Sequence, residues 1–572
     1  MAVYVHVVAI DFGTTYSGYA YSVTEPGSKL KEVTILANMV WNSGTSGVAS
    51  LKAPTSLLLT RDKEIVAFGF EAEEQYADIV LDGKADHYYF FHRFKMELHN
   101  NKNITSRMVL EDVRGQTLSA VEVFELSIKA LKDHLQRSVE IKNIKIDTER
   151  TRWVLTVPAI WTDRAKQFMR ESAELAGIPR HMLKIALEPE AASIYCQTFP
   201  SPGSKDITKV GSQYVIADLG GGTVDITVHE KLIDGTLKEL ERANGKACGG
   251  TSVDNAFYQL MIRLFGAPLL HKMKSNFPGC HLSLVRCFEG VKRTILPDKT
   301  GFVNVTIPFA TLNSLCQSEL GKDIIGIIQS SSKSEHFQLL GDKLRIDASV
   351  ALSLFKSTSD NIVSLLKSIV QKGRLYNIAG IILVGGFAEC KVVQKDVQTA
   401  FPGHNIVLQE DSGSVVLKGA VLFGYKSDYI SSRIARYTYG IRKTSTFDKN
   451  KYPEHRKTNV EGRDVCKNVF DPFIRANTSI LLGHEIEKTY NTYQKFQTEC
   501  NYEVFYTEND DVMFIDEVDC IRLGGLNLQI LNPTERVREM KAIFHFGDTE
   551  FSVTVVDVES GSQKKRFFEI KD

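Results

Sequence analysis

Two segments that lie far apart in the chain carry the same short pattern, and this repeat constrains the fold more than any other feature of the sequence. They are VVAIDFGTTYSGYAY at 7–21 and YVIADLGGGTVDITV at 214–228. In each, an apolar strand ends in Asp, a glycine-rich turn with Thr follows, and a second strand begins. The recurrence predicts a duplicated lobe with one strand–turn–strand element in each copy.

The two turns have the composition of a phosphate-binding cradle. Glycine permits positive φ and close backbone approach, so successive N–H groups can hold phosphate oxygens, and Thr hydroxyls add donors. The preceding Asp would repel phosphate unless Mg²⁺ lay between them, usually through waters that the metal retains. We therefore expect Asp11 and Asp218 to face each other around a Mg-nucleotide. Two ordinary hairpins are the alternative, and the matched Asp and Thr of the two copies argue against it.

Several other classes of protein are disfavoured. No G-x-x-x-x-G-K-[ST] occurs for a P-loop, and no G-x-G-x-x-G follows a strand for a dinucleotide fold. The 69 Lys+Arg balance 69 Asp+Glu, so we expect no nucleic-acid partner. No apolar run approaches the roughly 18 residues of a membrane helix, and the first residues lack the basic region of a signal peptide. These features predict a cytoplasmic protein without a membrane span.

Strands and helices alternate to about residue 425, and β-type alternation takes over after about 437. This shift predicts an α/β domain over 1–430 and an all-β domain over 431–572. In the first domain we expect buried strands at 3–10, 153–157 and 381–384, helices over 121–135 and 352–370, and a helix capped by Thr162 or Asp163. In the second we expect strands at 502–506, 540–546 and 551–558.

Six motifs occur in the order and spacing of the seventy-kilodalton heat-shock chaperones. They are DFGTTYSG at 11–18, TVPAIWTDRAKQFMRESAELAGI at 156–178, LEPEAASIY at 187–195, DLGGGTVDITV at 218–228, EGVKRT at 289–294 and ILVGG at 382–386. The chain resembles this family and, through FHRFKMEL at 91–98, VLKGAVLFGY at 416–425 and HFGDTEF at 545–551, its divergent 12A/12B branch. The resemblance implies an α/β actin-like ATPase of two RNase-H-like lobes, followed by an all-β sandwich domain.

The resemblance also implies roles for individual residues. Asp11 and Asp218 would surround the Mg²⁺ shell, Glu188 would orient the attacking water, and Lys95, rather than Arg93, would face the phosphate. The remaining matches are Gly13, Thr14, Thr15 and Tyr16 in the first phosphate loop, Gly220, Gly221, Gly222 and Thr223 in the second, and Gly249, Gly250, Glu289, Lys292, Arg293, Gly385 and Gly386 around ribose and adenine. For Glu289 and Lys292 alone, a solvated i,i+3 helix pair is the simpler interpretation, and the E-x-x-K-R-T context favours the nucleotide.

The chain departs from the family in two places. Gly385-Gly386-Phe387-Ala388-Glu389 replaces G-G-S-T-R, so an acid stands where an Arg that stacks on adenine is expected. SDYISSRIARYTYGI at 427–441 replaces the acid-flanked, leucine-rich linker that couples the two domains. The tail resembles the family's β-sandwich peptide-binding domain through YGIRK at 439–443, PFIRANTSI at 472–480 and FHFGDTEFSVTVVDVESG at 544–561, and the eleven residues after Gly561 leave no room for a helical lid.

The sequence thus predicts an ATP-binding, ATP-hydrolysing chaperone-like protein that uses ATP/ADP and Mg²⁺. Its catalytic residues would be Asp11, Lys95, Glu188, Asp218 and Thr223, and its β domain would contact unfolded or extended polypeptide or a signalling protein. The alternative is a nucleotide-switched adaptor or scaffold that binds ATP/ADP with little or no turnover. A small-molecule kinase of the same superfamily is disfavoured, because the β domain would have no use there.

Overall fold

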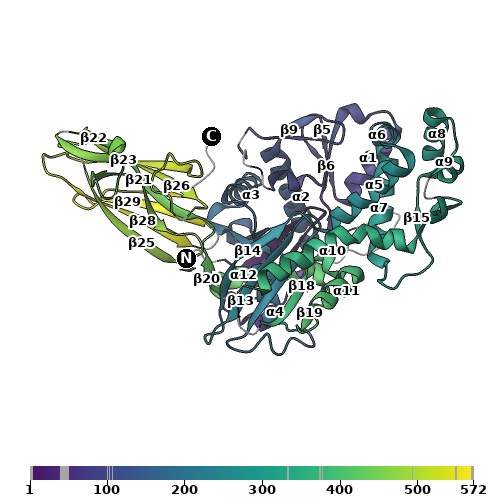
Figure 1. The fold of residues 1–572 in the computed structure, drawn as a ribbon, viewed down its shortest axis with the longest axis horizontal. Helices are drawn as coiled ribbons and strands as arrows, with labels where there is room; N and C mark the ends of the chain where they lie inside the picture. Colours follow the sequence, from purple (N-terminus) through teal and green to yellow (C-terminus); the bar gives the residue numbers. More distant parts are fainter. Residues whose placement is uncertain are drawn as a thin grey trace. The chain divides into compact units, whose positions relative to one another are not determined.

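The chain divides into two compact units, each described here by itself (Figure 1). The computed structural model describes residues 4–38, 41, 51–99, 101, 104–105, 107–331, 334–372, 375, 378–460, 462–492, 494–509, 511–547 and 550–567. Unit 1 comprises Met1–Thr227 and Ala243–Lys426, and unit 2 comprises Val228–Arg242 and Ser427–Asp572. The expected division was a single cut after residue 430, whereas the segment Val228–Arg242 groups with the second unit.

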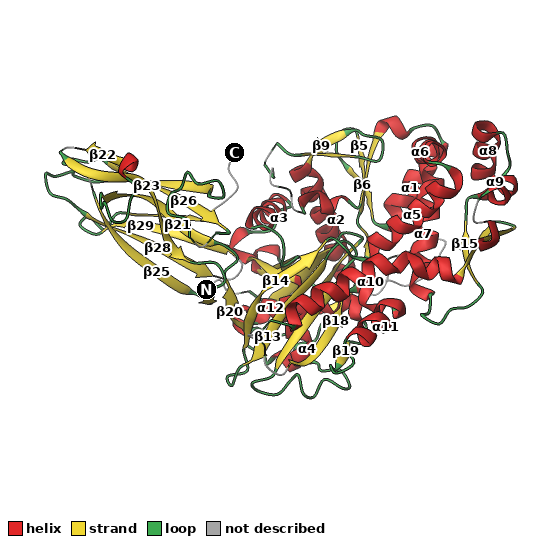
Figure 2. Ribbon diagram, in the orientation of Figure 1, coloured by secondary structure: helices red, strands yellow, loops and turns green. Residues whose placement is uncertain are grey.

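Two mixed sheets form the frame of unit 1 (Figure 2). In the first, the order is β11 (Leu183–Leu187), β10 (Thr151–Val157), β1 (His6–Phe12), β2 (Tyr16–Ser22) and β3 (Leu36–Ala37), and β4 (Ala53–Pro54) also pairs with β2. In the second, β19 (Ile406–Leu408), β18 (Ile378–Val384), β12 (Gln213–Leu219) and β13 (Val224–Lys231) follow one another. Strands β1 and β12 are apolar and almost wholly buried, as strands covered on both faces are.

A pair of helices lies between these two sheets. Helix α12 (Val415–Tyr425) packs on β1 and β10, helix α4 (Glu188–Thr198) packs on β12, and the two helices pack on each other. They approach so closely that a Cβ added to Gly419 would lie 1.9 Å from the carbonyl oxygen of Ala191. The strand ends of both sheets are thereby held against one rigid helix pair.

The other elements of unit 1 surround this frame. Helices α2 (Ala120–Glu140) and α3 (Asp163–Leu175) pack on each other, and α10 (Ala348–Val370) packs on α5 (Gly250–Phe265) and α11 (Lys391–Ala400). The remaining helices are α1 (Phe70–Leu81), α6 (Ala267–Asn276), α7 (Pro278–Thr294), α8 (Phe309–Leu320) and α9 (Ile324–Ser330). Small sheets are made by β5 (Ser56–Thr60), β6 (Ile65–Phe68) and β7 (Tyr88–His92), by β8 (Val109–Glu111) and β9 (Thr117–Ser119), and by β15 (Phe302–Thr306), β16 (Phe337–Leu340) and β17 (Lys343–Asp347). None of the described helices combines the length and apolar character that a membrane crossing requires.

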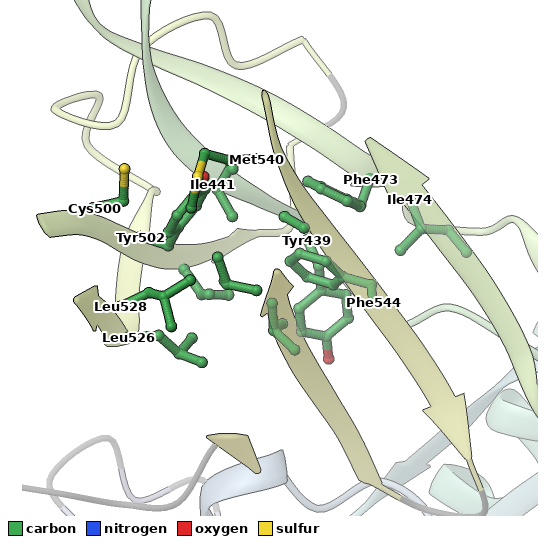
Figure 3. Packing of buried hydrophobic residues seen from close by; sticks show 14 of the residues in the cluster. Tyr439, Ile441, Phe473, Ile474, Cys500, Tyr502, Leu526, Leu528, Met540 and Phe544 are labelled. Atoms are coloured by element: carbon green, nitrogen blue, oxygen red, sulfur yellow. The ribbon is translucent and has the colours of Figure 1, made fainter. Parts of the chain in front are cut away.

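Unit 2 is built from two antiparallel sheets that share one apolar core (Figure 3). One sheet has the order β22 (Lys457–Val460), β23 (Arg463–Ile474), β21 (Thr438–Thr446), β26 (Glu499–Thr507) and β27 (Ile521–Gln529), and the other β25 (His484–Asn491), β28 (Glu539–Gly547), β29 (Glu550–Asp557) and β30 (Gln563–Phe567). Side chains of both sheets meet in the core, where the rings of Phe473 and Phe544 stack with centroids 3.9 Å apart.

The order of the second sheet continues after β13 with strands that pair the inserted segment with residues that follow Lys426. Strand β20 (Ile430–Ile434) runs parallel to β14 (Leu237–Lys246) and antiparallel to β24 (Ser479–Leu481). Side chains reinforce this pairing, because Ser431 Oγ donates to the carbonyl of Leu237 at 3.0 Å and Glu239 Oε2 accepts from the N–H of Ile434 at 2.8 Å. The residues that replace the expected linker are therefore partly a paired strand.

The elements expected from local patterns are present, with shifts at their ends. The Thr162 cap is confirmed, because its side chain accepts from the N–H of Ala165 at 3.2 Å at the start of α3. The first strand was expected to end before Asp11, but β1 continues through Asp11 and Phe12, because pairing with Thr156 of β10 extends the ladder. Residue 3, where that strand was expected to begin, lies outside the described residues.

Candidate active site

A cavity of about 1050 Å³ opens in unit 1 where the two repeated elements meet. Its lining includes every residue predicted for the nucleotide site except Gly249, whose neighbour Gly250 does line it. Lys95 lies in this lining and Arg93 does not. The structure thus gathers residues from Asp11 to Gly386, separated by hundreds of positions, at one place.

The two glycine-rich turns face each other at close range. A Cβ added to Gly221 would lie 2.3 Å from Thr15 Oγ1, and one added to Gly222 would lie 2.6 Å from Thr14 Oγ1. Any side chain at these two positions would collide with the opposite turn. The sequence pattern of glycine in one turn and Thr in the other is therefore a steric requirement of this arrangement.

The second turn is held by the start of helix α5. The N–H groups of Gly249, Gly250 and Thr251 donate to the carbonyls of Gly222, Gly220 and Gly221 at 3.1, 3.1 and 2.8 Å. These bonds fix the carbonyls toward the helix. Among the described residues, the N–H groups of Gly221 and Gly222 donate to no backbone carbonyl, which leaves them available to an anion in the cavity.

Four carboxylates gather beside these turns: the buried Asp11, Asp218 and Asp225, and the partly buried Glu188. Burial and the carboxylates of Glu188, Asp225 and Asp11 raise the pKa of Asp218 well above its usual range. Burial also raises the pKa of Asp225, and it raises the pKa of Glu188 to about 7 although Lys95 opposes this shift. Such crowding of negative charge favours proton or cation uptake.

Among the described residues, these carboxylates do not form a complete set of metal ligands. Within the described part of the chain, no three His, Cys, Asp or Glu side chains are grouped so that they could hold a metal ion. Glycine at position 385 keeps space beside one of the acids, because a Cβ there would lie 2.3 Å from Asp218 Oδ1. A cation bound here would therefore take most of its ligands from elsewhere.

Two lysines enter the same group of charges. Lys95 Nζ lies 3.0 Å from Glu188 Oε1 and 5.0 Å from the ring centre of Trp161. Lys52 Nζ lies 2.5 Å from Asp11 Oδ2, while Thr156 Oγ1 donates to Asp11 Oδ1 at 2.7 Å. Burial alone would raise the pKa of Asp11, but the ammonium of Lys52 holds it below its ordinary value.

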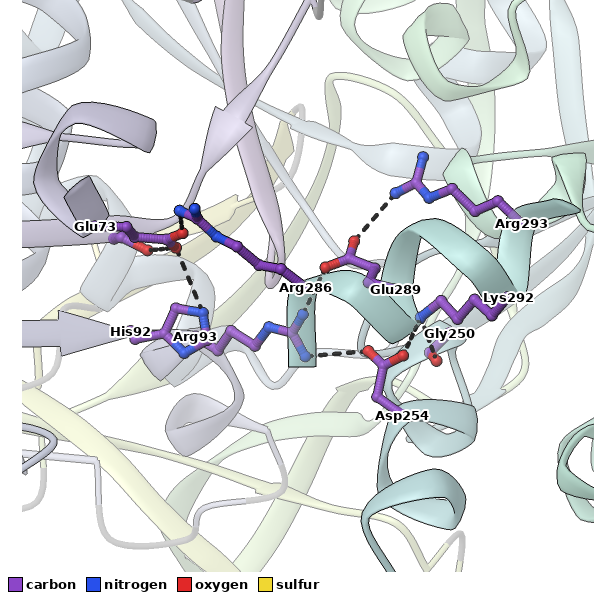
Figure 4. Close-up of polar contacts among 10 residues, drawn as sticks. Glu73, His92, Arg93, Gly250, Asp254, Arg286, Glu289, Lys292 and Arg293 are labelled. Atoms are coloured by element: carbon purple, nitrogen blue, oxygen red, sulfur yellow. Dashed lines mark hydrogen bonds and ion pairs between the residues drawn. The ribbon is translucent and has the colours of Figure 1, made fainter. Parts of the chain in front are cut away.

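A network of ion pairs joins α5 and α7 at the other side of the cavity (Figure 4). Arg93 donates to Asp254 at 3.1 Å and to Glu289 at 2.8 Å. Lys292 donates to Asp254 at 2.5 Å and to the carbonyl of Gly250 at 2.9 Å, so it does not form the simple helix pair with Glu289. Arg93 thus helps to position Glu289, which was predicted for the nucleotide site, but Arg93 itself does not line the cavity.

The same network of ion pairs reaches the aromatic ring of Tyr16, which belongs to the first glycine-rich turn. Arg293 donates to Glu289 at 3.2 Å, and its guanidinium lies 5.5 Å from the ring centre of Tyr16. Glu389, which stands in place of the expected Arg, lines the cavity and accepts from the N–H of Gly413 at 3.2 Å. The wall of the cavity here is therefore charged with both signs.

The comparison with known protein families decides the family. The family model described as "Hsp70 protein" matches residues 81–425, which is more than half of the chain. The chain belongs to the Hsp70 family. It is 33% identical to human heat shock 70 kDa protein 12B over 96% of its own length and 89% of that protein. It is 32% identical to mouse heat shock 70 kDa protein 12A over 98% of its length and 90% of that protein.

A more distant match reaches the wider family. The chain is 27% identical to the Chaperone protein HscA homolog of Chromobacterium violaceum over 56% of its own length and 44% of that protein. The expected family and its 12A/12B branch are thus confirmed. The Hsp70 family consists of nucleotide-binding ATPases, and the cavity lies within its matched region and the segment before it.

Three residues of this Hsp70-family site were not identified from the sequence. Asp225 lies inside the DLGGGTVDITV motif, so the matched motif was a signal that could have identified it. Asp254 and Lys52 lie outside any of the six motifs. Lys52 reaches Asp11 across 41 positions, and only the pairing of β4 with β2 brings it there.

Proposed function

We propose that this Hsp70-family protein binds ATP or ADP with Mg²⁺ in the cavity of unit 1 and hydrolyses ATP slowly in a chaperone-like role. The observation that carries the proposal is the meeting of two matched Gly/Thr turns beside Asp11, Glu188 and Asp218 in one cavity. The volume of about 1050 Å³ is within the range of ligand sites that accept a nucleotide-sized molecule.

The residues present fit a hydrated Mg²⁺. Asp11 and Asp218 would hold it through water, since the described residues offer no cage of three ligands and Mg²⁺ keeps several waters. Burial and neighbouring carboxylates raise the pKa of Asp218 well above its usual range, and a cation nearby would favour its ionised form. When bound, the ion would neutralise charge on the phosphate oxygens.

The chain's own groups would position the reactants. The N–H groups of Gly221 and Gly222 and the hydroxyls of Thr14 and Thr15 would bind phosphate oxygens from two sides. Lys95 would bind the transferred phosphoryl group while it holds Glu188 at 3.0 Å. Burial raises the pKa of Glu188 to about 7, so near neutral pH a part of this group is ionised and can accept a hydrogen bond from water.

Binding and turnover are tested by two measurements on the full chain. Calorimetry with Mg-ADP should detect binding, and ligand at about 100 times its Kd should add about 2.7 kcal/mol to the free energy of unfolding. Asp218→Ala should reduce this gain, through loss of Mg²⁺ placement, without unfolding the protein. Unchanged melting and calorimetry in saturating Mg-ATP and Mg-ADP would overturn the proposal. Release of phosphate, with and without an unfolded client, then tests hydrolysis.

We also infer the domain organisation that the family suggests. The two mixed sheets, each with its own turn, support a nucleotide-binding domain of two RNase-H-like lobes over 1–430. The two antiparallel sheets on one core support a β-sandwich over 431–572. Among the described residues, β22 and β25 each end a sheet, and an extended polypeptide can pair with such an edge.

A nucleotide-switched adaptor with little or no turnover is the second candidate. It is favoured by Glu389, whose acid alters the wall of the cavity, and by β20, which occupies the place of the linker. Tight binding of Mg-ATP without release of phosphate in a single turnover would establish the adaptor and exclude the ATPase.

A further inference from the structure

Lys52 is a cation fixed inside the proposed nucleotide cavity. It directly precedes β4, whose pairing with Tyr16 and Ser17 of β2 holds this segment beside the first turn. Its aliphatic stem lies over Gly18, where an added Cβ would be 2.9 Å from Lys52 Cγ. The ammonium lies 2.5 Å from Asp11, and the Lys52 side chain is only 19% exposed.

The charge of Lys52 acts on the carboxylates that were predicted to surround a metal. Lys52 lines the same cavity as Asp11, Glu188 and Asp218, and its ammonium forms an ion pair with Asp11. Asp11 has both oxygens engaged, one with Lys52 and the other with Thr156. Asp11 is thus already paired with a cation of the chain itself.

An ammonium can join a carboxylate to a phosphate. It donates up to three hydrogen bonds from one compact charge, so it can bind Asp11 and a phosphate oxygen at the same time. A metal placed between Asp11 and phosphate would serve the same electrostatic purpose. The structure therefore offers two ways to bring nucleotide phosphate next to Asp11, and one of them is part of the polypeptide.

We propose that Lys52 binds nucleotide phosphate from its position on Asp11 and thereby makes nucleotide binding largely independent of Mg²⁺. This inference rests on the proposed function, because it assumes that the cavity takes a nucleotide. It assigns Lys95 and Lys52 to different carboxylates, Glu188 and Asp11. Lys52 is then a binding residue that supplies charge where Asp11 would otherwise repel the ligand.

The test compares the affinity of the full chain for ADP in Mg²⁺ and in EDTA by calorimetry. Wild-type protein should bind ADP in EDTA within about tenfold of its affinity in Mg²⁺. Lys52→Met should lose a further factor of about 10–100 in EDTA, which is the worth of one charge-assisted hydrogen bond, and less in Mg²⁺. Lys52→Arg should keep the affinity in EDTA, and Lys84→Met, at an exposed surface pair with Asp82, should behave as wild type.

Each other outcome overturns the inference. If the ratio of the two affinities is the same in wild type and Lys52→Met, Lys52 does not replace the metal. If Lys52→Met binds ADP more tightly in Mg²⁺ than wild type does, Lys52 blocks a metal and does not substitute for it. Failure of wild type to bind in either condition overturns the proposed function as well, whereas strict dependence on Mg²⁺ overturns this inference alone. Thermal melting shows whether Lys52→Met folds. If it does not fold, the affinity of Lys52→Arg for ADP in EDTA decides, and a loss of that affinity overturns the inference.

Discussion

Glu188 is the residue at which binding and chemistry can be separated. It stands at the start of α4, in contact with Lys95 and next to the carboxylates of Asp11 and Asp218. Glu188→Gln keeps the size of the side chain and an oxygen for Lys95, but it removes the negative charge. We expect the affinity for Mg-ADP to stay within a few-fold and single-turnover hydrolysis to slow by roughly 10²–10³-fold.

Rapid-quench measurement of one turnover checks this prediction. Equal rates for wild type and Glu188→Gln would remove Glu188 from the mechanism. A large loss of affinity instead would mean that Glu188 acts in binding.

His229 makes the stability of unit 2 depend on pH. It lies fully buried in β13, and burial, together with the nearby Arg433, lowers its pKa to about 3. A histidine in the unfolded chain takes up its proton near pH 6.5, so acid favours the unfolded state. Between about pH 7.5 and pH 5.5 the folded protein should lose about 1.4 kcal/mol on account of this residue, and the loss should grow as the pH falls toward about 3.

Urea unfolding of wild type and His229→Gln at the two pH values measures this contribution. At the higher pH, His229→Gln should be no more stable than wild type. On acidification, its free energy of unfolding should fall less than that of wild type. His484→Gln, at an exposed position on β25, is the matched control and should keep the wild-type dependence. Identical acid dependence in wild type and His229→Gln would contradict the assignment.

For single residues, the local motifs allowed the site to be predicted. Residues that reach the site through contacts between distant parts of the chain could not be predicted. Asp11, Thr14 and Gly221 stand in a pattern whose spacing within one turn already implies a common target. Lys52 has no such pattern, and its role depends on which strand β4 joins. The same holds for Lys292, because its partner Asp254 comes from another helix.

The crossing of α4 and α12 is the element-scale feature most sensitive to a single atom. Gly419→Ala would place a Cβ 1.9 Å from the carbonyl oxygen of Ala191, so the helices would have to separate. Because interiors are close-packed and overpacking is costly, we expect a loss of about 2–3 kcal/mol or more. Thermal or urea unfolding in the absence of nucleotide measures it.

A second helical glycine provides the matched control for this substitution. Gly290 lies in α7, and no atom is recorded within 4 Å of an added Cβ there. Gly290→Ala should therefore stabilise the protein by up to about 1 kcal/mol, since alanine has the higher helix propensity. If both variants change stability equally, the tight crossing is not what limits position 419.

Helices and strands with strong periodicity were predictable to within a few residues. The expected strand over 540–546 is found as β28 at Glu539–Gly547, and the helix expected over 352–370 as α10 at Ala348–Val370. Their ends shifted because pairing and capping involve neighbours outside the apolar pattern. Asp347, for example, starts α10 early by accepting from the N–H of Ser349 at 2.9 Å.

For the whole molecule, the division of the chain was the feature least accessible to sequence reasoning. The segment Val228–Arg242 begins at the last residue of a motif of the nucleotide site, and its composition does not set it apart. It groups with unit 2 because β14 pairs with β20, nearly two hundred positions later, as Leu237 opposite Ile430. Such pairing depends on tertiary structure and leaves no periodic mark at either place.

This pairing bears on whether nucleotide and polypeptide binding influence each other. Residues 430–434 form β20, and its bonds to β14 and β24 would have to break before the segment could move as a free linker. A coupling free energy requires an element with two arrangements that both ligands bias. The strand disfavours such a second arrangement at this place.

We therefore predict that ATP changes the release of bound polypeptide little. Stopped-flow release of a fluorescent hydrophobic peptide from the full chain should give rates in ATP and ADP that differ by less than about fivefold, a coupling of under about 1 kcal/mol. Contacts along a sheet edge are open to solvent, so release should also be fast, since differences in affinity appear mostly in the off-rate. Release measured without nucleotide is the control and should proceed at about the same rate. Slow release in ADP that accelerates by orders of magnitude in ATP would show that β20 does not prevent coupling, and the proposed role of this strand would have to be abandoned.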